Sequence, residues 1–365
     1  MSALRVLVVD DSAVIRRVVR EVVAADPELE VAGVAANGKI ALAMVDQCSP
    51  DVVIMDIEMP EMDGVTAVRE IRRNHPKLRV IMFSNLTERA ALATLDALAA
   101  GADDYVTKPS NAQSVTEGSE RIREQLVPKI KALCGRRLRQ TIIRSPIQLS
   151  ASPKLILPSS KIEVVAIGAS TGGPNALAEI MPRIPGDFPV PILIVQHMPP
   201  VFTAFLAERL AASAQIPIKE ASPNARVEPN HAWIAPGDFH MTVVPEALQT
   251  HLAMDQRPPQ NSCRPSVDVL FRSVAEVFGS RSLAVVLTGM GQDGLRGCEY
   301  IHEAGGQIVV QDEATSVVWG MPGAVANAGI ADRILPLAAI AEEIIRSVTA
   351  RRCLQPESAV QAGVV

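Results

Sequence analysis

The strongest constraint on the fold is an alternation of short apolar strands with amphipathic helices, which the chain runs through twice. The first series occupies residues 1–110 and the second begins at residue 163. Strands that alternate with helices form parallel sheets covered by helices on both faces. The predicted strands are Arg5–Val9, Glu30–Val34, Val52–Met55, Arg79–Phe83 and Asp104–Val106, then Glu163–Ala169, Pro191–Gln196, Ser282–Thr288 and Gln307–Gln311. The sequence therefore predicts an α/β protein with two doubly wound parallel-sheet domains.

The composition changes between the two series. Residues 126–160 hold seven lysines and arginines, no acidic residue and four prolines, which is typical of a tether rather than a core, although a helical pattern over 112–134 overlaps its start. We predict domains over 1–125 and 161–350, a basic linker over 126–160 and a flexible tail over 351–365. Docking of the linker on an acidic partner is the alternative interpretation.

Bulk properties exclude several classes of protein. The net charge of −5 gives no general attraction to nucleic acid or anionic membranes. The N-terminus lacks the features of a signal peptide, and no apolar run approaches the roughly 20 residues of a membrane span. The five cysteines form no C-x-x-C pair, so we expect neither a disulfide framework nor a zinc site. We expect a cytoplasmic protein without direct membrane insertion.

Polar residues follow four of the first five predicted strands. Asp10-Asp11, Asp56, Ser84 and Lys108-Pro109 stand at these strand ends. Carboxyl ends of parallel strands meet at one edge of a sheet, where functional side chains gather. Carboxylates beside an ammonium suit Mg²⁺, and one carboxylate can then attack a phosphoryl donor. The pattern predicts a phosphoacceptor site with Mg²⁺.

This pattern resembles the response-regulator receiver domain, over residues 1 to about 125. The resemblance implies a flavodoxin-like sheet with strand order 2-1-3-4-5. It implies that Asp56 is phosphorylated by the chemotaxis histidine kinase and that Lys108 grips the phosphate. Ser84 and Tyr105 would form the switch pair. The implied Mg²⁺ ligands are Asp11, Asp56 and the backbone of Glu58, with Asp10 in support.

A second set of strand ends carries the residues of a hydrolytic triad. Ser170 lies in a G-x-S-x-G turn between a strand and a helix, which exposes a serine hydroxyl. His197 ends the next strand, where it can act as base, and Asp293 lies in a glycine-rich loop where it can orient the imidazole. That loop also offers backbone N–H groups for an oxyanion.

Other interpretations of these residues exist. The Gly168–Gly173 segment could cradle a phosphate, but its spacing is not G-x-G-x-x-G and no Gly-Lys-Ser/Thr follows. Asp293 could cap a helix, and Asp268 is a rival acid, although it stands at the start of a helical pattern. The order Ser…His…Asp differs from that of α/β-hydrolases, which indicates a separate fold.

The second half resembles the CheB protein-glutamate methylesterase catalytic domain, over about residues 162–348. The motifs that carry the resemblance are Ile167–Pro174, Val195–Pro200, Ala235–Met241, Pro265–Phe271, Leu287–Gly294 and Gln311–Val325. It implies a Rossmann-like domain without a cofactor, in which the backbone N–H of Met290 helps to hold the oxyanion and Thr171 borders the site. Val201 and Asn85 depart from the family pattern, at positions that are not catalytic.

The resemblance implies demethylation of glutamate methyl esters on methyl-accepting chemoreceptors, with methanol as product, and deamidation of receptor glutamines. We expect the receiver domain to cover the Ser170 edge until Asp56 is phosphorylated. Two other functions were weighed: a binding regulator with an inactive hydrolase-like domain, and a receiver-coupled DNA-binding protein. An intact Ser170/His197/Asp293 set opposes the first, and the lack of a basic helix-turn-helix effector opposes the second.

Overall fold

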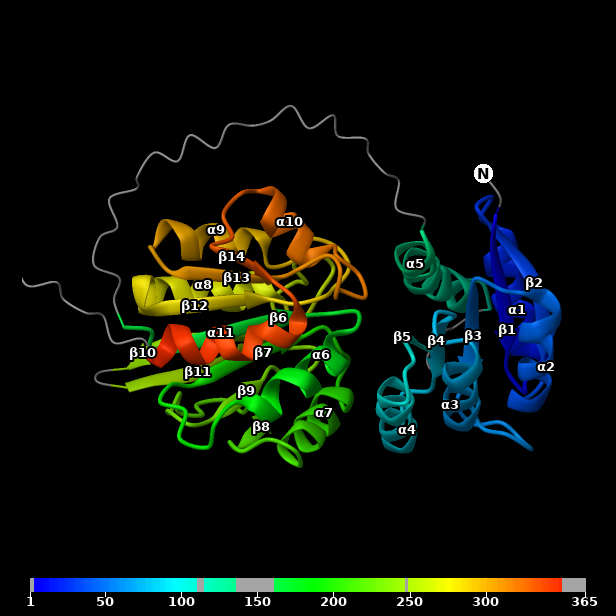
Figure 1. Ribbon diagram of the computed structural model, residues 1–365, viewed down its shortest axis with the longest axis horizontal. Coiled ribbons are helices and arrows are strands. Elements are labelled where there is room, and N and C mark those ends of the chain that lie inside the picture. Colours follow the sequence, from blue (N-terminus) through cyan, green and yellow to red (C-terminus); the bar gives the residue numbers. More distant parts are fainter. Residues whose placement is uncertain (1–2, 110–114, 136–160, 247–248, 350–365) are drawn as a thin grey trace, which may run out of the picture.

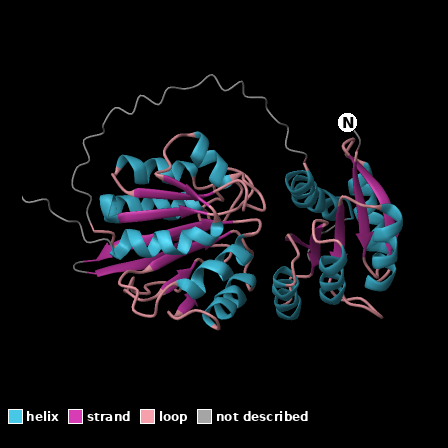
Figure 2. Cartoon of the chain, viewed as in Figure 1, coloured by secondary structure: helices cyan, strands magenta, loops and turns pink. Residues whose placement is uncertain are grey.

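A computed structural model describes residues 3–109, 115–135, 161–246 and 249–349 (Figure 1). Most of the predicted linker and the predicted tail lie outside these residues. Two helix-covered sheets stand side by side, and Figure 2 shows the strands enclosed by helices in each. The predicted fold class, α/β with two doubly wound parallel sheets, is confirmed.

The N-terminal sheet has five parallel strands in the order β2-β1-β3-β4-β5, as predicted. Its core strands are buried on both faces, because helices cover both sides. The elements are β1 (Leu4–Val9), α1 (Ala13–Ala24), β2 (Leu29–Ala35), α2 (Gly38–Cys48), β3 (Val52–Asp56), α3 (Gly64–Asn74), β4 (Arg79–Ser84), α4 (Glu88–Ala99), β5 (Asp104–Thr107) and α5 (Val115–Cys134).

Side-chain caps fix where the N-terminal helices start. The hydroxyl of Ser12 accepts the backbone N–H of Ile15 ahead of α1, and Thr87 accepts that of Ala90 ahead of α4. The last helix, α5, agrees with the helical pattern over 112–134, and it continues beyond the domain boundary that was predicted at residue 125. Its residues Leu126, Val127, Ile130 and Leu133 are buried in the core, so apolar spacing outweighs the basic composition there.

The C-terminal sheet has seven strands, all parallel, in the order β14-β13-β12-β6-β7-β9-β8. The central trio β12, β6 and β7 is fully buried. The elements of this sheet are β6 (Val164–Ala169), α6 (Gly173–Ile180), β7 (Ile192–Gln196), α7 (Phe202–Ala211), β8 (Ile218–Glu220), β9 (Ala232–Ile234), α8 (Val267–Phe278), β12 (Ser282–Val286), α9 (Leu295–Glu303), β13 (Gln307–Gln311), α10 (Met321–Asn327), β14 (Arg333–Leu335) and α11 (Leu337–Thr349).

An antiparallel hairpin, β10 (His240–Glu246) with β11 (Gln249–Asp255), adds a feature that the alternation did not predict. It packs on α8, and Met241, Val243 and Leu252 belong to the core on that side of the sheet. The hairpin therefore adds to the apolar core on the α8 side of the sheet.

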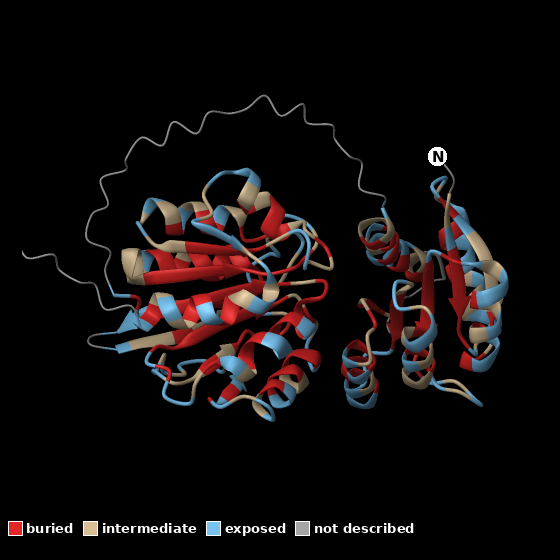
Figure 3. Cartoon of the chain, in the orientation of Figure 1, coloured by how far each residue is buried: buried red, intermediate tan, exposed pale blue. Residues whose placement is uncertain are grey.

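The two units pack against each other through α4 of the first and α6 and α7 of the second (Figure 1). Apolar residues of both units form one continuous cluster that includes Leu95, Leu98, Leu177 and Phe202. Figure 3 shows buried residues in both sheets and on the facing helices. No helix in the part of the chain that the structure describes is long and apolar enough to cross a membrane.

Candidate functional site

The predicted phosphoacceptor residues meet at the carboxyl edge of the N-terminal sheet. Oxygen atoms of Asp10, Asp11 and Asp56 lie within 4.8 Å of one another. Lys108 Nζ lies 2.7 Å from Asp10 Oδ2 and 2.8 Å from Asp56 Oδ1. Mg²⁺ binds proteins through one or two carboxylates and keeps several waters, so this cluster of carboxylates fits the ion. The side chain of Glu58, whose backbone was the further predicted ligand, is exposed and pairs with Arg89.

Burial governs the electrostatics of this cluster. It raises the pKa of Asp56 to about 6, and the neighbouring charge of Asp10 acts in the same direction against the Lys108 ammonium. Burial also opposes the charge on Lys108, but its hydrogen bonds with Asp10 and Asp56 raise its pKa overall. The cluster therefore carries excess negative charge at neutral pH, which a divalent cation offsets.

The two predicted switch residues lie on neighbouring strands, Ser84 at the end of β4 and Tyr105 on β5, and on the same face of the sheet, because the register pairs Tyr105 with Met82. Ser84 is buried, and its Oγ accepts a hydrogen bond of 2.8 Å from the hydroxyl of Thr94 on α4. Tyr105 is also buried, and its ring stacks on Phe202 of α7 with the centroids 5.1 Å apart. Tyr105 therefore contacts the second unit directly.

The predicted triad residues follow the three central strands of the C-terminal sheet. Ser170 follows β6, His197 follows β7, and Asp293 lies in the loop between β12 and α9. The register pairs Ala169 with Gln196, so the first two residues leave the sheet at the same level. The backbone carbonyl of Ser170 accepts hydrogen bonds from the Gln196 side chain and from Gly173 N–H, which closes the turn. Parallel strand pairing thus brings all three segments to one edge.

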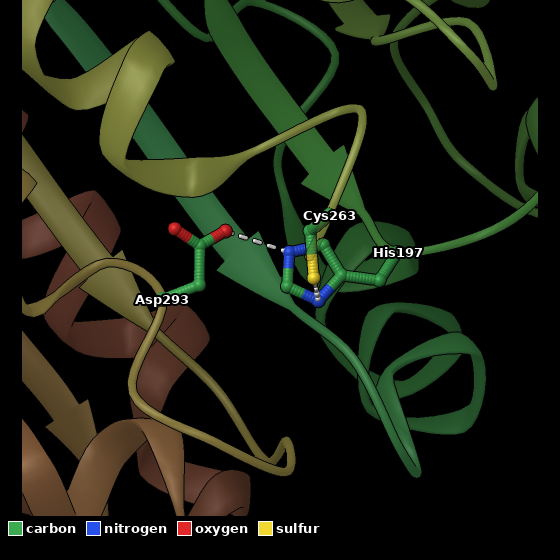
Figure 4. Close-up of side chains that lie close together, drawn as sticks. All are labelled: His197, Cys263 and Asp293. Atoms are coloured by element: carbon green, nitrogen blue, oxygen red, sulfur yellow. Dashed lines mark hydrogen bonds and ion pairs between the residues drawn. The ribbon is translucent and has the colours of Figure 1, made fainter. Parts of the chain in front are cut away.

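His197 and Asp293 are in direct contact: Nε2 of His197 lies 2.8 Å from Oδ2 of Asp293 (Figure 4). Burial lowers the pKa of His197, but its hydrogen bonds with Asp293 and Cys263 raise it overall. Burial raises the pKa of Asp293, yet the hydrogen bond from His197 and its other donors hold it below its usual range. Ser170 and His197 line the same small cavity. The other ring nitrogen of His197, Nδ1, lies 3.5 Å from Sγ of Cys263.

Four further donors hold the Asp293 carboxylate, and the sequence interpretation missed them. They are Ser266 Oγ at 2.8 Å, Val267 N–H at 2.7 Å, Asp268 N–H at 3.2 Å and Asn261 Nδ2 at 3.0 Å. Three of them lie at the start of α8, within the motif Pro265–Phe271, to which the family resemblance gave no roles. A serine directly before a helix was the available signal, because such residues often hydrogen-bond nearby groups.

Asp268, the alternative candidate for the acid of the triad, has a different structural role. Its Oδ1 accepts the backbone N–H groups of Gly294 at 2.9 Å and Gly297 at 2.7 Å. It therefore caps the N-terminus of α9 from outside and fixes the loop that carries Asp293. Burial raises its pKa, and the Asp293 charge adds to this effect. The helical pattern that surrounds this residue is that of α8, which begins at Val267.

The residues predicted to border the oxyanion face the other unit. Thr171 is buried, and its hydroxyl donates a 2.7 Å hydrogen bond to Oδ2 of Asp104 on β5. Met290 packs against the core cluster of the N-terminal unit, beside Val317 and Val318. The backbone around Thr171 is held in turn by Thr288, whose hydroxyl donates to the Thr171 carbonyl at 2.9 Å.

The cavity beside Ser170 is closed by residues of the N-terminal unit. Its lining includes Ser170, Thr171 and His197 from the C-terminal unit, and Leu98, Asp104, Tyr105 and Lys129 from the other. Its volume is about 20 Å³, which is room for about one water molecule and not for a substrate side chain. Lys129 Nζ contacts Asp104 at 3.0 Å and the Tyr105 carbonyl at 2.7 Å, which fixes this wall.

Comparison with known proteins assigns each half of the chain to a protein family. A family model described as CheB methylesterase matches residues 165–344, and one described as response regulator receiver domain matches residues 6–118. A protein-glutamate methylesterase/protein-glutamine glutaminase of Trichodesmium erythraeum (strain IMS101) is 51% identical over 95% of this chain and 100% of its own length. One from Nocardioides sp. (strain ATCC BAA-499 / JS614) is 48% identical over 100% of both chains. The crystal structure of the Thermotoga maritima CheB methylesterase catalytic domain matches with a TM-score of 0.50 and 41% identity, over 51% of this chain and 99% of that one.

Proposed function

The chain belongs to the family of CheB methylesterases with a receiver domain, and from this premise we propose that it is a phosphorylation-activated protein-glutamate methylesterase and protein-glutamine glutaminase. Its substrates are glutamate methyl esters and glutamine amides on the cytoplasmic part of chemoreceptors. The enzyme works in the cytoplasm, with the chemotaxis histidine kinase as phosphodonor. The observation that carries this proposal is the His197–Asp293 pair beside Ser170, in a cavity walled by the receiver domain.

The proposed chemistry is nucleophilic catalysis through an acyl-enzyme. Ser170 Oγ attacks the ester carbonyl, and His197 takes its proton. Because Nε2 is engaged by Asp293, the proton passes to Nδ1. His197 then gives the proton to the leaving methoxide, so methanol departs and an acyl-serine remains. Water attacks the acyl-serine with the same base, and the glutamate carboxylate is released. A glutamine amide reacts in the same way and releases ammonia.

The backbone N–H of Met290 is the proposed donor to the oxyanion, with Thr171 at the border of the site. Preorganised donors of this kind contribute about 10²–10³ in rate each. Both residues lie against the receiver domain in this structure. Substrate access therefore requires the receiver domain to move away.

The receiver site is proposed to accept the phosphoryl group on Asp56. Asp11, Asp56 and the Glu58 backbone would hold Mg²⁺, Asp10 would support the ion, and Lys108 would bind the phosphate. The ion supplies charge neutralisation for the transferred group. The buried, charge-dense cluster around Asp56 and the ammonium of Lys108 support these roles.

Activation is proposed to be a shift between a closed and an open arrangement of the two domains. Ser84 and Tyr105 reorient when Asp56 is phosphorylated, and movement of Tyr105 ends its stacking on Phe202. The neighbouring Asp104 then releases Thr171. An alternative function, a regulator with an inactive hydrolase domain, has no observation in its favour, because His197 and Asp293 retain hydrogen-bonding geometry.

The test is methanol release from a methylated receptor fragment, with and without a small-molecule phosphodonor and Mg²⁺. We expect the phosphodonor to raise the rate in the natural protein and to leave Asp56→Asn at the basal rate. Ser170→Ala should release no methanol while retaining the melting temperature and the Mg²⁺-dependent phosphorylation. Methanol release by Ser170→Ala would overturn the catalytic assignment, and an unchanged rate after phosphorylation would overturn the closed-state mechanism.

A further inference from the structure

Cys263 and His197 form a second arrangement of ligand atoms, of which the esterase chemistry uses only His197. Sγ of Cys263 lies 3.5 Å from Nδ1 of His197, and Asp293 holds the opposite ring nitrogen (Figure 4). One ligand atom from each of the three side chains lies within 4.8 Å of the others. From these contacts we propose that His197 and Cys263 bind a thiophilic divalent cation such as Zn²⁺, which inhibits the esterase. The inhibition, but not the binding, rests on the proposed function.

The separation of the two ligand atoms suits such an ion. Zinc lies about 2.3 Å from a thiolate sulfur and about 2.0 Å from an imidazole nitrogen, and a tetrahedral angle then separates sulfur from nitrogen by about 3.5 Å. The observed Sγ–Nδ1 distance is 3.5 Å. The sulfur lies over the face of the imidazole ring in Figure 4, so binding requires the Cys263 side chain to rotate toward the ring plane, where the Nδ1 lone pair points.

The hydrogen bonds that hold the His197 ring also suit a metal site. In neutral His197, Asp293 accepts a hydrogen bond from Nε2–H, which leaves the lone pair on Nδ1, the ring nitrogen nearer to Cys263. A carboxylate behind a metal-bound histidine fixes its orientation and raises its basicity. The Asp293 carboxylate is itself fixed by Ser266 and Val267. Soft thiolate with imidazole selects zinc-like ions over Mg²⁺, whose ligands here are the receiver carboxylates.

Metal binding and catalysis compete for one lone pair. The ion forms bonds to Nδ1 and Sγ, the thiol proton leaves to solvent, and water completes the coordination. Nδ1 is the atom that must take the Ser170 proton, so the metal-bound enzyme has no general base. The absence of a C-x-x-C pair predicted no zinc site from sequence, but here the two ligands are 66 residues apart and only the fold joins them.

Cobalt provides a direct test of binding on the full chain, because a thiolate ligand gives a near-ultraviolet sulfur-to-cobalt charge-transfer band. All proteins carry Cys353→Ser, and excess Mg²⁺ occupies the receiver carboxylates. We expect the band in this parent and its loss in Cys263→Ser and in Cys263→Ala. Cys48→Ser and Cys134→Ser, which replace other partly buried thiols, should retain it. Melting curves check that each variant is folded. A band that survives both Cys263 substitutions, or no band in the parent, would refute the site.

Inhibition is measured separately, as methanol release in the phosphorylated state with buffered free Zn²⁺, each variant relative to its own metal-free rate. Cys263→Ser should raise the half-inhibiting Zn²⁺ concentration about tenfold or more, since even an outer partner of a metal ligand contributes 10- to 100-fold in affinity. Equal sensitivity of Cys263→Ser and Cys134→Ser would overturn the inhibitory role. The cobalt band remains informative if no esterase activity is found, so the two proposals fail independently.

Discussion

The hydroxyl of Thr171 donates a 2.7 Å hydrogen bond to the carboxylate of Asp104, and both side chains are buried. Thr171 directly follows Ser170, and Asp104 directly precedes Tyr105. One buried contact therefore connects the residue beside the proposed nucleophile with the residue beside the proposed switch.

The first prediction concerns this contact. Asp104→Ala should raise methanol release without a phosphodonor by about tenfold, because a hydrogen bond to a charged group contributes about 1.5–3 kcal/mol, here to the closed arrangement. Glu299→Ala, which removes a partly exposed carboxylate on α9, is the control and should keep the basal rate. A basal rate for Asp104→Ala equal to that of the control would contradict the prediction, provided that both variants melt normally.

A second prediction concerns the rim of the same interface. Arg209 of α7 pairs with Asp96 of α4 at 2.7 Å, but both side chains are substantially exposed. Exposed pairs contribute about 0–1 kcal/mol. Arg209→Ala should therefore raise the basal methanol-release rate less than fivefold, and high salt should do the same to the natural protein. An effect larger than that of Asp104→Ala would show that the rim, not the buried contact, holds the closed arrangement.

The third prediction separates the two neighbouring acids. Asp293→Asn should lower the rate of methanol release by about 10³–10⁴, because an amide cannot stabilise the imidazolium as a carboxylate does. Asp268→Asn should instead lower the melting temperature, since Asp268 caps α9 and does not contact His197. The rate of methanol release by Asp268→Asn, measured well below the melting temperature of that variant, should fall less than tenfold. Comparable losses of rate in the two variants would contradict the division of roles.

The fourth prediction concerns Asp56 and pH. Burial raises the pKa of Asp56 from 3.8 to about 6, so its contribution to folded-state stability is present below pH 4 and is lost as pH rises through about 6. At pH 7.5 in EDTA, Asp56→Asn should therefore be more stable than the natural protein by about 3 kcal/mol, since each pKa unit corresponds to about 1.4 kcal/mol.

Denaturant unfolding of the receiver domain at pH 4 and pH 7.5, within the full chain, checks this expectation. The difference between the natural protein and Asp56→Asn should shrink at pH 4, and Mg²⁺ should stabilise only the natural protein at pH 7.5. A difference that is independent of pH would show that the amide acts through packing rather than through charge.

The sequence alone determined the two sheets and the edge at which each site lies. Alternating apolar strands and helices require parallel sheets, and parallel strands place every residue after a strand end at one edge. Asp10, Asp56, Ser170 and His197 could therefore be assigned to a sheet edge from their positions along the chain. In the structure Asp10 lies with Asp56, and Ser170 and His197 line one cavity. The position of Asp293 was predicted in the same way, because it lies in the glycine-rich loop after a predicted strand.

Tertiary structure alone decided which residues from elsewhere in the chain contact the carboxyl edges of the two sheets. The contact of Thr171 with Asp104 joins residues 67 positions apart, and that of His197 with Cys263 joins residues 66 positions apart. Neither follows from a local pattern, because the first depends on surface complementarity between two domains and the second on the path of an irregular loop. Periodicity specifies which face of an element is buried. It does not specify which other surface covers that face, since long-range packing alone sets that choice.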